Sequence, residues 1–286
     1  MSGAELVAGL GLPELQDKAG RTRRIVPVSQ KRRRIPRPLT RTAGPVLFFL
    51  AWHIASVTGA LPAEVLAGPT TVISAGAQLW QSGELPSAIV VSLGRAMSGL
   101  AIGGSAGIAL ALLSGLFRLG EDLIDATVQM LRTIPIVALI PLLIIWFGIG
   151  EPPKVALIAL ATAFPLYINL HAGIRGVDQA LVEAGRTLGL GQVGLIVHVI
   201  LPGALPSALV GFRYSLAVSW LALVFGEQIN ASAGVGYLMN TAREFFQTDI
   251  IVVCLVVYAA LGLLVDAIIR FLEKVLLSWR PAFTGA

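Results

Sequence analysis

The stretch LVEAGRTLGLGQVGLIVHVILPGALP, residues 181–206, is polar and rich in glycine, and it separates two long apolar segments of the chain. Just before it, Asp178 is a suitable N-cap for a short helix over residues 177–188. Gly189 is placed to end that helix. Pro202 ends the next apolar run, because proline cannot continue a helix from inside but can begin one. The pattern predicts a compact elbow on the cytoplasmic side of a membrane, between two spans.

The rest of the chain has the composition of a membrane protein. Of 286 residues, 56% are hydrophobic and 13% are charged, and the mean hydropathy is +0.82. The sequence contains no block with the mixed composition of a soluble domain, so one all-α, bundle-sized membrane domain is expected. The single cysteine, Cys254, lies in an apolar run. It excludes an intrachain disulfide and a multi-cysteine metal cluster, and a packing role is favoured.

Several apolar segments are long enough, or nearly so, to be candidate spans. They are residues 44–61, 88–116, 127–149, 153–173, 203–226 and 250–272. We therefore expect a polytopic protein with about six transmembrane helices, and residues 44–274 as its transmembrane domain. Between the spans, we expect residues 62–86 to form an amphipathic helix on the outer surface. Residues 148–153 should form a tight hairpin, and residues 227–249 a second outer segment.

The distribution of basic residues predicts the orientation of the chain. Ten of its 21 Lys and Arg residues fall before residue 44. Such a cluster holds the adjoining end of a span in the cytoplasm and attracts anionic lipid. We expect residues 1–43 to form a disordered, basic cytoplasmic tail. With an even number of spans, residues 275–286 form a second cytoplasmic tail. Because the basic residues directly precede a hydrophobic span, we expect no nucleic-acid partner for the first tail. A cleavable signal peptide over residues 45–60 is the other alternative, and the long basic stretch before it and the apolar length favour an uncleaved first span.

The elbow resembles the loop found in membrane subunits of ATP-binding-cassette (ABC) importers. The pattern of that loop is E-A-A, three residues, G, nine residues, I, one residue, then L-P. The matching residues in this chain are Glu183, Ala184, Gly185, Gly189, Val199, Leu201 and Pro202. The spacing matches in full, with Gly185 in place of the second alanine and Val199 in place of the isoleucine. Beyond the loop, the resemblance covers roughly residues 44–282.

The resemblance implies a permease of the type I ABC importer fold, which is a transport subunit and not an enzyme. It implies a coupling segment within residues 177–202 that enters a groove on a cytoplasmic ATPase subunit. The residues carried over to this contact are Glu183, Ala184, Gly185, Arg186, Gly189, Leu190, Leu201 and Pro202. Small Ala184 and Gly185 would permit close docking, while Glu183 and Arg186 could form ion pairs at the rim.

The resemblance also implies partners and a location. The permease would be a homodimer in the inner or plasma membrane of a prokaryote, with both termini cytoplasmic. Two ATPase subunits would use ATP and Mg, with no cofactor bound by this chain, and an extracytoplasmic solute-binding protein would deliver the substrate.

The likeness is greatest to the aliphatic sulfonate permeases, which implies that the chain imports aliphatic sulfonates. It is carried by residues 129–132, 138–148, 198–207, 242–245 and 247–249. Permeases for taurine, nitrate and bicarbonate share the same elbow and remain alternatives.

Charged and helix-bending residues within the spans are candidates for the translocation path, because a charge in hydrocarbon must face protein, water or a counter-ion. Arg132 precedes Pro135 and Pro141, and these prolines can bend the helix beside a cavity. This arrangement suits a gate near the cytoplasmic half. The alternative is that Arg132 snorkels to the inner interface and that the prolines shape packing. Arg95 and Arg213 are the other two such charges. Arg213 lies further inside its span and is harder to explain by snorkelling.

Two polar residues near Pro165 are weaker candidates for the same path. Asn169 and Tyr167 could line a polar route, or each could form a hydrogen bond between helices.

The sequence contains few of the residue clusters that an enzyme needs. The three histidines lie in separate segments, and they form no metal-ligand pair at helical spacing. A phosphate-binding G-x-x-x-x-G-K-[ST] motif is absent, so energy must come from a partner or from an ion gradient. A self-sufficient ion-coupled transporter is the rival class. It would require inverted repeats and a midplane carboxylate, neither of which we detect. A membrane-embedded enzyme is a more distant alternative.

Overall fold

The computed structural model describes residues 37–276, without the side chains of residues 37–43 and Asn230. Most of the predicted basic tail (residues 1–36) and of the C-terminal tail (277–286) therefore lies outside the described residues. The helices are α1 (Arg37–Val57), α2 (Pro69–Gln81), α3 (Glu84–Leu116), α4 (Arg118–Gly120), η2 (Glu121–Asp125), α5 (Ala126–Leu131), η3 (Ile136–Leu139), α6 (Ile140–Phe147), α7 (Glu151–Arg175), α8 (Gln179–Thr187), α9 (Gln192–Leu195), η4 (Ile196–Ile200), α10 (Leu201–Asn230), α11 (Val235–Glu244) and α12 (Thr248–Leu276). No strand occurs among residues 37–276, which confirms the predicted all-α class.

The chain divides into two units, residues 1–50 and residues 51–286, and α1 crosses the division. In the first unit, residues 44–50 are all exposed. In the second unit, Trp52 packs against a core cluster that includes Val72 and Leu79 of α2. The helix expected between residues 62 and 86 is therefore present as α2, and its apolar face is buried.

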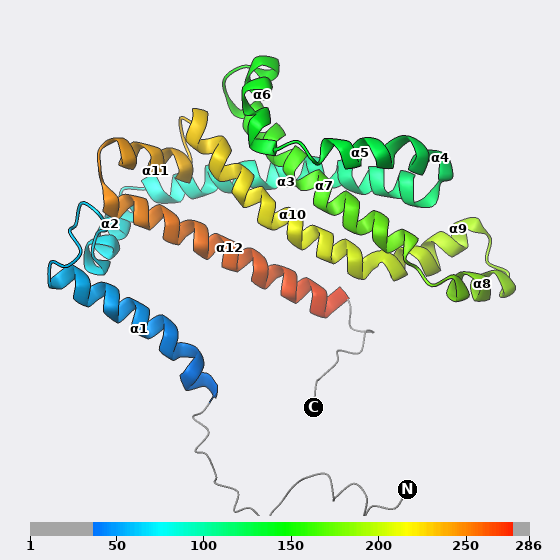
Figure 1. Cartoon of the computed structure of the whole chain (residues 1–286), viewed down its shortest axis with the longest axis horizontal. Coiled ribbons are helices and arrows are strands. Elements are labelled where there is room, and N and C mark those ends of the chain that lie inside the picture. Colours follow the sequence, from blue (N-terminus) through cyan, green and yellow to red (C-terminus); the bar gives the residue numbers. More distant parts are fainter. Residues whose placement is uncertain (1–36, 277–286) are drawn as a thin grey trace, which may run out of the picture. The chain divides into compact units, whose positions relative to one another are not determined.

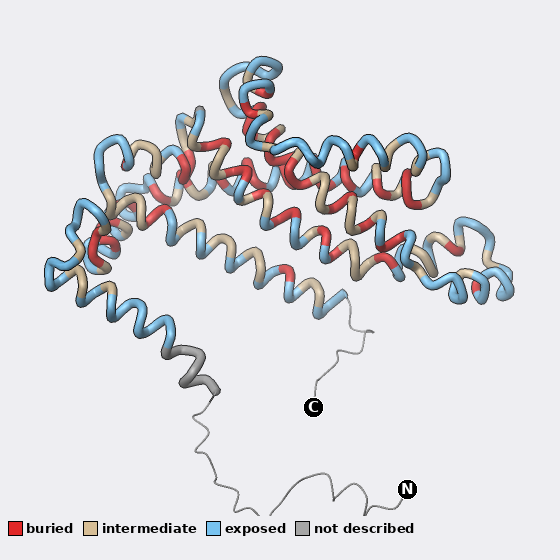
Figure 2. The backbone as a smooth tube through the Cα atoms, in the orientation of Figure 1, coloured by how far each residue is buried: buried red, intermediate tan, exposed pale blue. Residues whose placement is uncertain are grey.

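Helix α7 packs along both α3 and α10, and these three helices form the centre of the second unit (Figure 1). Buried residues are concentrated along the same helices (Figure 2). Glycine spacing in α3 explains the close contact with α7. Gly99, Gly103 and Gly107 recur every four residues and therefore lie on one face of the helix. A Cβ atom at Gly107 would lie only 2.6 Å from the carbonyl oxygen of Ala163 in α7, so the two backbones approach closely because side chains are absent here.

Within residues 37–276, four helices are long and apolar enough to cross a membrane: Glu84–Leu116, Glu151–Arg175, Gln192–Ile229 and Thr248–Leu276. A fifth candidate is the helix pair Arg118–Leu131 and Ile136–Phe147, which is bent by 89° at its break. The apolar part of α1, Gly44–Val57, is shorter. The expected count of about six is therefore approximate.

The span predicted over residues 127–149 is not one continuous helix. The break lies where Arg132 is followed by Thr133, Ile134 and Pro135. Proline has no N–H to donate and disfavours helical geometry in the residue before it. The bend predicted from the prolines is thus present, and it is sharp enough to interrupt the helix.

The boundary predicted at Pro202 is also different in the structure. Residues 192–229 form one uninterrupted helical run, in which η4 (Ile196–Ile200) is a π-helical turn. Pro202 lies in the first turn of α10, where a missing N–H is tolerated.

Candidate functional site

The elbow is a helical hairpin whose ends are stabilised locally. The Asp178 carboxylate accepts a hydrogen bond from the Ala180 backbone N–H at 2.9 Å, so it is the N-cap predicted for α8. At the other end, Gly189 has φ of +87°. The N–H of Leu190 donates to the Gly185 carbonyl at 3.1 Å, and the N–H of Gly189 donates to the Arg186 carbonyl at 3.0 Å. These two bonds and the left-handed glycine form a Schellman motif, which ends the helix.

Gly185 is buried inside the elbow, not presented on its surface. A Cβ atom at this position would lie 2.8 Å from Leu195 of α9 and 3.3 Å from Leu190. The absence of a side chain therefore lets α8 fold back on α9. The expectation that Gly185 permits docking of a partner is corrected to this internal role, because its surface is already occupied.

The other residues predicted for ATPase coupling are mostly on the surface of the elbow. Glu183, Ala184, Arg186, Gly189, Leu201 and Pro202 are exposed, and Leu190 is partly buried. Apolar side chains accompany them: Leu181 is 58% exposed, Leu188 83% and Val193 75%. Water does not favour such a group of exposed side chains, so the elbow has the composition of a contact surface.

The residues predicted for the translocation path are not brought together. Arg132, Pro135 and Pro141 are exposed at the bend between α5 and α6. Within residues 37–276, no hydrogen bond or ion pair joins this bend to Asn169 or Arg213. The bend, Asn169 and Arg213 are therefore separate features of the structure.

Asn169 and Tyr167 have different partners. The Asn169 side-chain amide donates to the Pro165 carbonyl of its own helix at 2.8 Å, so it is satisfied within α7. The Tyr167 hydroxyl donates to the Asp125 carboxylate in η2 at 2.9 Å. Of the two hydrogen bonds considered between helices, the one from Tyr167 is present.

Arg213 forms an ion pair between α10 and α12. Its Nη2 lies 2.8 Å from the Asp266 carboxylate, which also accepts from Arg270 at 2.6 Å. One carboxylate therefore faces two guanidinium groups. Arg213 and Asp266 also line a hollow of about 280 Å³ between the two helices, together with Trp220 and Tyr258.

A largely buried ion cluster, which joins the N-terminal part of α3 to the start of α7 and the end of α10, was not predicted. Arg95 of α3 donates from Nε and Nη2 to the two oxygens of Glu151 at 2.5 and 2.6 Å. Its Nη1 donates to Glu227 and to the Ala233 carbonyl, both at 2.6 Å. The side chain of Arg95 is 4% exposed, that of Glu227 is 0% exposed, and that of Glu151 is 54% exposed. Lys154 joins the cluster through Glu151 at 3.2 Å.

The same cluster holds the start of α11. The Gly236 N–H donates to Glu227 Oε2 at 2.8 Å, and the Val235 N–H donates to Ser92 Oγ at 2.9 Å. Ser92 in turn donates to Glu227 at 2.7 Å, and Tyr258 of α12 donates to it at 3.3 Å. Glu227 is thus a carboxylate at a helix N-terminus, where backbone N–H groups and the helix dipole favour a negative charge.

Glu227, where the sequence predicts that the second outer segment begins, is buried in the last turn of α10. Arg95 was recognised as a charge that needs a counter-ion, but no partner was assigned. The feature of the sequence that could have indicated this partner was a second charge, Glu227, at the edge of an apolar run. The two residues are 132 positions apart, so local spacing could not pair them.

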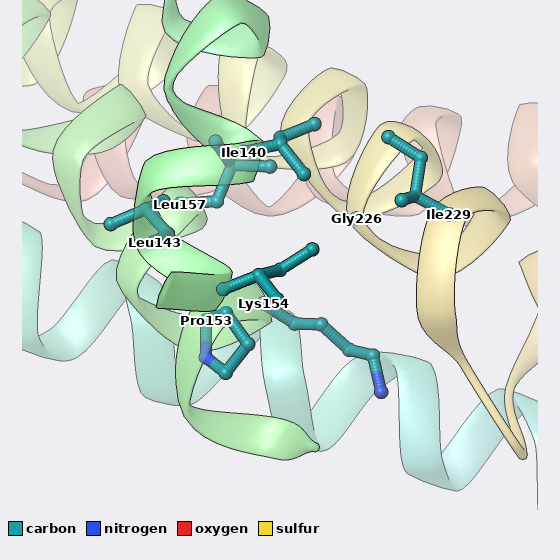
Figure 3. A pocket seen from close by; sticks show the side chains of 8 residues that line it. Ile140, Leu143, Pro153, Lys154, Leu157, Gly226 and Ile229 are labelled. Carbon is teal, nitrogen blue, oxygen red and sulfur yellow. The ribbon is translucent and has the colours of Figure 1, made fainter. Parts of the chain in front are cut away.

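A small apolar cavity lies beside the cluster, between α6, α7 and α10 (Figure 3). Its volume is about 10 Å³, room for at most one water molecule. Its lining is Ile140, Leu143, Ile144, Pro153, Lys154, Leu157, Gly226 and Ile229. It is a packing defect in the core and not a solute site.

Comparisons with known proteins agree with the sequence resemblance. The family model described as "Binding-protein-dependent transport system inner membrane component" matches residues 103–277. The putative aliphatic sulfonates transport permease protein SsuC of Escherichia coli (strain K12) is 49% identical over 239 residues, which cover 84% of this chain and 91% of that protein. The SsuC protein of Bacillus subtilis (strain 168) is 40% identical, covering 84% and 87%.

More distant matches include a second transport system and solved structures. The taurine transport system permease protein TauC of Escherichia coli (strain K12) is 35% identical, covering 76% of this chain and 78% of that protein. A structure titled as an inward-facing conformation of the MetNI methionine ABC transporter has a TM-score of 0.59 at 17% identity, covering 68% of this chain and 97% of that chain. At this identity the structural likeness supports the fold alone.

Proposed function

Since the chain belongs to the binding-protein-dependent transport system inner membrane components, we propose that it is the permease subunit of an ABC importer for aliphatic sulfonates. The permease role follows from the family. The substrate class is supported by the two SsuC proteins, which are 49% and 40% identical over 84% of the chain. Taurine is the second candidate, because TauC is 35% identical over 76% of the chain.

The partners follow from this role. A permease of this family works with an ATPase and a solute-binding protein, and ATP and Mg are used by the ATPase. We propose two copies of this chain with two ATPase subunits, each contacted by one elbow. The exposed side chains of Leu181 and Leu188 would be covered in that contact, with Glu183 and Arg186 at its rim.

We propose that both termini are cytoplasmic, since the basic residues gather at the N-terminus. In this orientation the elbow faces the ATPase. The hairpin before α7 and the ion cluster beside it lie at the extracytoplasmic end of the bundle.

The path for the anion is proposed to pass Arg132 and Arg213. A sulfonate carries a permanent charge, so it needs positive potential without a salt bridge strong enough to trap it. Arg213 suits this requirement because Asp266 partly neutralises it and Arg270 shares the same carboxylate. Two guanidinium groups and one carboxylate leave one net positive charge there.

The decisive experiment reconstitutes the permease with its genomically neighbouring ATPase and binding protein in liposomes. ATP hydrolysis is measured with ethanesulfonate, taurine, nitrate or bicarbonate, and a complex without binding protein is the control. Stimulation by ethanesulfonate is expected. Stimulation by nitrate or bicarbonate with no response to either sulfonate would overturn the substrate class and leave the permease role intact.

A further inference from the structure

We propose that Arg95, Glu151 and Glu227 position the extracytoplasmic end of the bundle during transport. Together they form a latch that holds this end closed in the resting state. The ion pair of Arg95 with Glu151 breaks first when the solute-binding protein binds. The proposal rests on the proposed function, because it needs the orientation that puts residues 148–150 outside.

The buried arm of the latch is the Arg95–Glu227 pair. Glu227 accepts hydrogen bonds from Arg95, Ser92, Gly236 and Tyr258. Each carboxylate oxygen therefore has more than one donor, and the residue is 1% exposed. A buried charge that loses its partner is left uncompensated in a medium of low dielectric, so this arm should persist through small movements.

The exposed arm is the Arg95–Glu151 pair, and its physical situation is different. The two hydrogen bonds are short, at 2.5 and 2.6 Å, but the Glu151 side chain is 54% exposed. Water and salt screen such a pair, and water can replace Arg95 as the partner of the carboxylate. Glu151 also follows Gly148 and Gly150, whose φ values are +76° and +145°. The hairpin that carries Glu151 thus has glycines at the two positions with positive φ.

Several elements meet at the latch, so a change in its hydrogen bonds acts on all of them. Arg95 joins α3 to the start of α7 and to the end of α10, and Ala233 belongs to the turn between α10 and α11. Glycines let this turn approach the charges: a Cβ atom at Gly234 would lie 2.6 Å from Nη1 of Arg95. Alternating access requires one end of the bundle to open while the other closes. Release of Glu151 would free α7 from this junction while Glu227 keeps α11 on α10.

The test removes the exposed arm and measures coupling in the reconstituted complex. Glu151→Gln keeps the size of the side chain and removes its charge, and Glu227→Gln does the same in the buried arm. The matched control is Glu84→Gln, an exposed carboxylate at the start of α3. ATP hydrolysis is measured without binding protein, and again with binding protein and whichever of the four anions stimulates the unchanged complex.

If the latch restrains the resting state, Glu151→Gln raises hydrolysis without binding protein by about two- to fivefold, the range expected for loss of a half-exposed ion pair. The stimulation by binding protein falls correspondingly, while Glu84→Gln behaves as the unchanged protein. A second readout is a cysteine at Leu157 of α7, which is 1% exposed and packs against α3 and α10, in a background lacking Cys254. It should react faster with an impermeant maleimide once Glu151 is replaced.

The proposal is overturned if Glu151→Gln and Glu84→Gln give the same basal and stimulated rates, or if Glu151→Gln lowers both rates in parallel. The second result would mean a purely structural role. Glu227→Gln is expected to affect assembly as well, so the decision rests on Glu151. Failure of the proposed function would look different, because the unchanged complex would then respond to none of the four anions.

Discussion

Replacing Gly107 of α3 by alanine should destabilise the bundle, because the added Cβ atom has no space. It would lie 2.6 Å from the carbonyl oxygen of Ala163 and 3.2 Å from its Cα atom. Both are backbone atoms, so no side chain can rotate away. Restoring an ordinary contact of 3.4 Å requires the helices to separate by about 0.8 Å. Over-packing of this kind costs about 1–3 kcal/mol, and the better helix propensity of alanine returns at most about 1 kcal/mol.

The matched control is Gly94→Ala in the same helix. Among the described residues, nothing lies within 4 Å of a Cβ atom at Gly94, so this change should be neutral or stabilising by up to about 1 kcal/mol. The detergent-solubilised subunit carries its own probe, because its single cysteine, Cys254, is 0% exposed. A thiol-reactive fluorophore then reports unfolding on heating.

With about 2–4 °C per kcal/mol for a chain of this size, the midpoint for Gly107→Ala should lie several degrees below that for Gly94→Ala. Equal midpoints for the two variants would refute close backbone contact as the reason for the glycines.

Two further predictions concern the elbow and the topology. Gly189→Val should abolish uptake while the protein remains at normal abundance, because a β-branched residue is strongly disfavoured at φ of +87°. The control is Gly191→Ala, where φ is −70°. Normal uptake by Gly189→Val would contradict a coupling role for the elbow. In a cysteine-free background, a cysteine at Gln81 should react with an impermeant maleimide in intact cells and one at Gln192 should not, since the first is expected outside and the second inside. Labelling of residue 192 in intact cells would reverse the proposed orientation.

Local signals in the sequence account for the helices and for the shape of the elbow. Long apolar runs can satisfy their backbone groups in a membrane only as helices or closed barrels, so the all-α class followed from composition and length. Asp178 and Gly189 act on neighbouring backbone groups, and both have the capping roles that were predicted. The family signature in the elbow was equally local, since it depends on spacing alone.

Features that depend on how neighbouring helices meet were not predictable in the same way. Pro135 indicated a bend, but the 89° angle between the two helices depends on their packing. Gly185 was small enough to suit either a partner's surface or the elbow's own interior. Only the positions of Leu190 and Leu195 show that the interior contains it.

The amino-acid sequence by itself determined that this chain is a helical membrane protein with a capped elbow, because hydropathy and capping act over a few turns. The spacing of the elbow motif added the resemblance to the permease family. The tertiary structure alone decided the partners of its buried charges. Arg95 and Glu227 are 132 residues apart, and their pairing requires that the N-terminal part of α3 lies beside the end of α10. Burial then removes the competing water. The ion pair therefore depends on which helices pack together and not on the spacing of the two charges along the sequence.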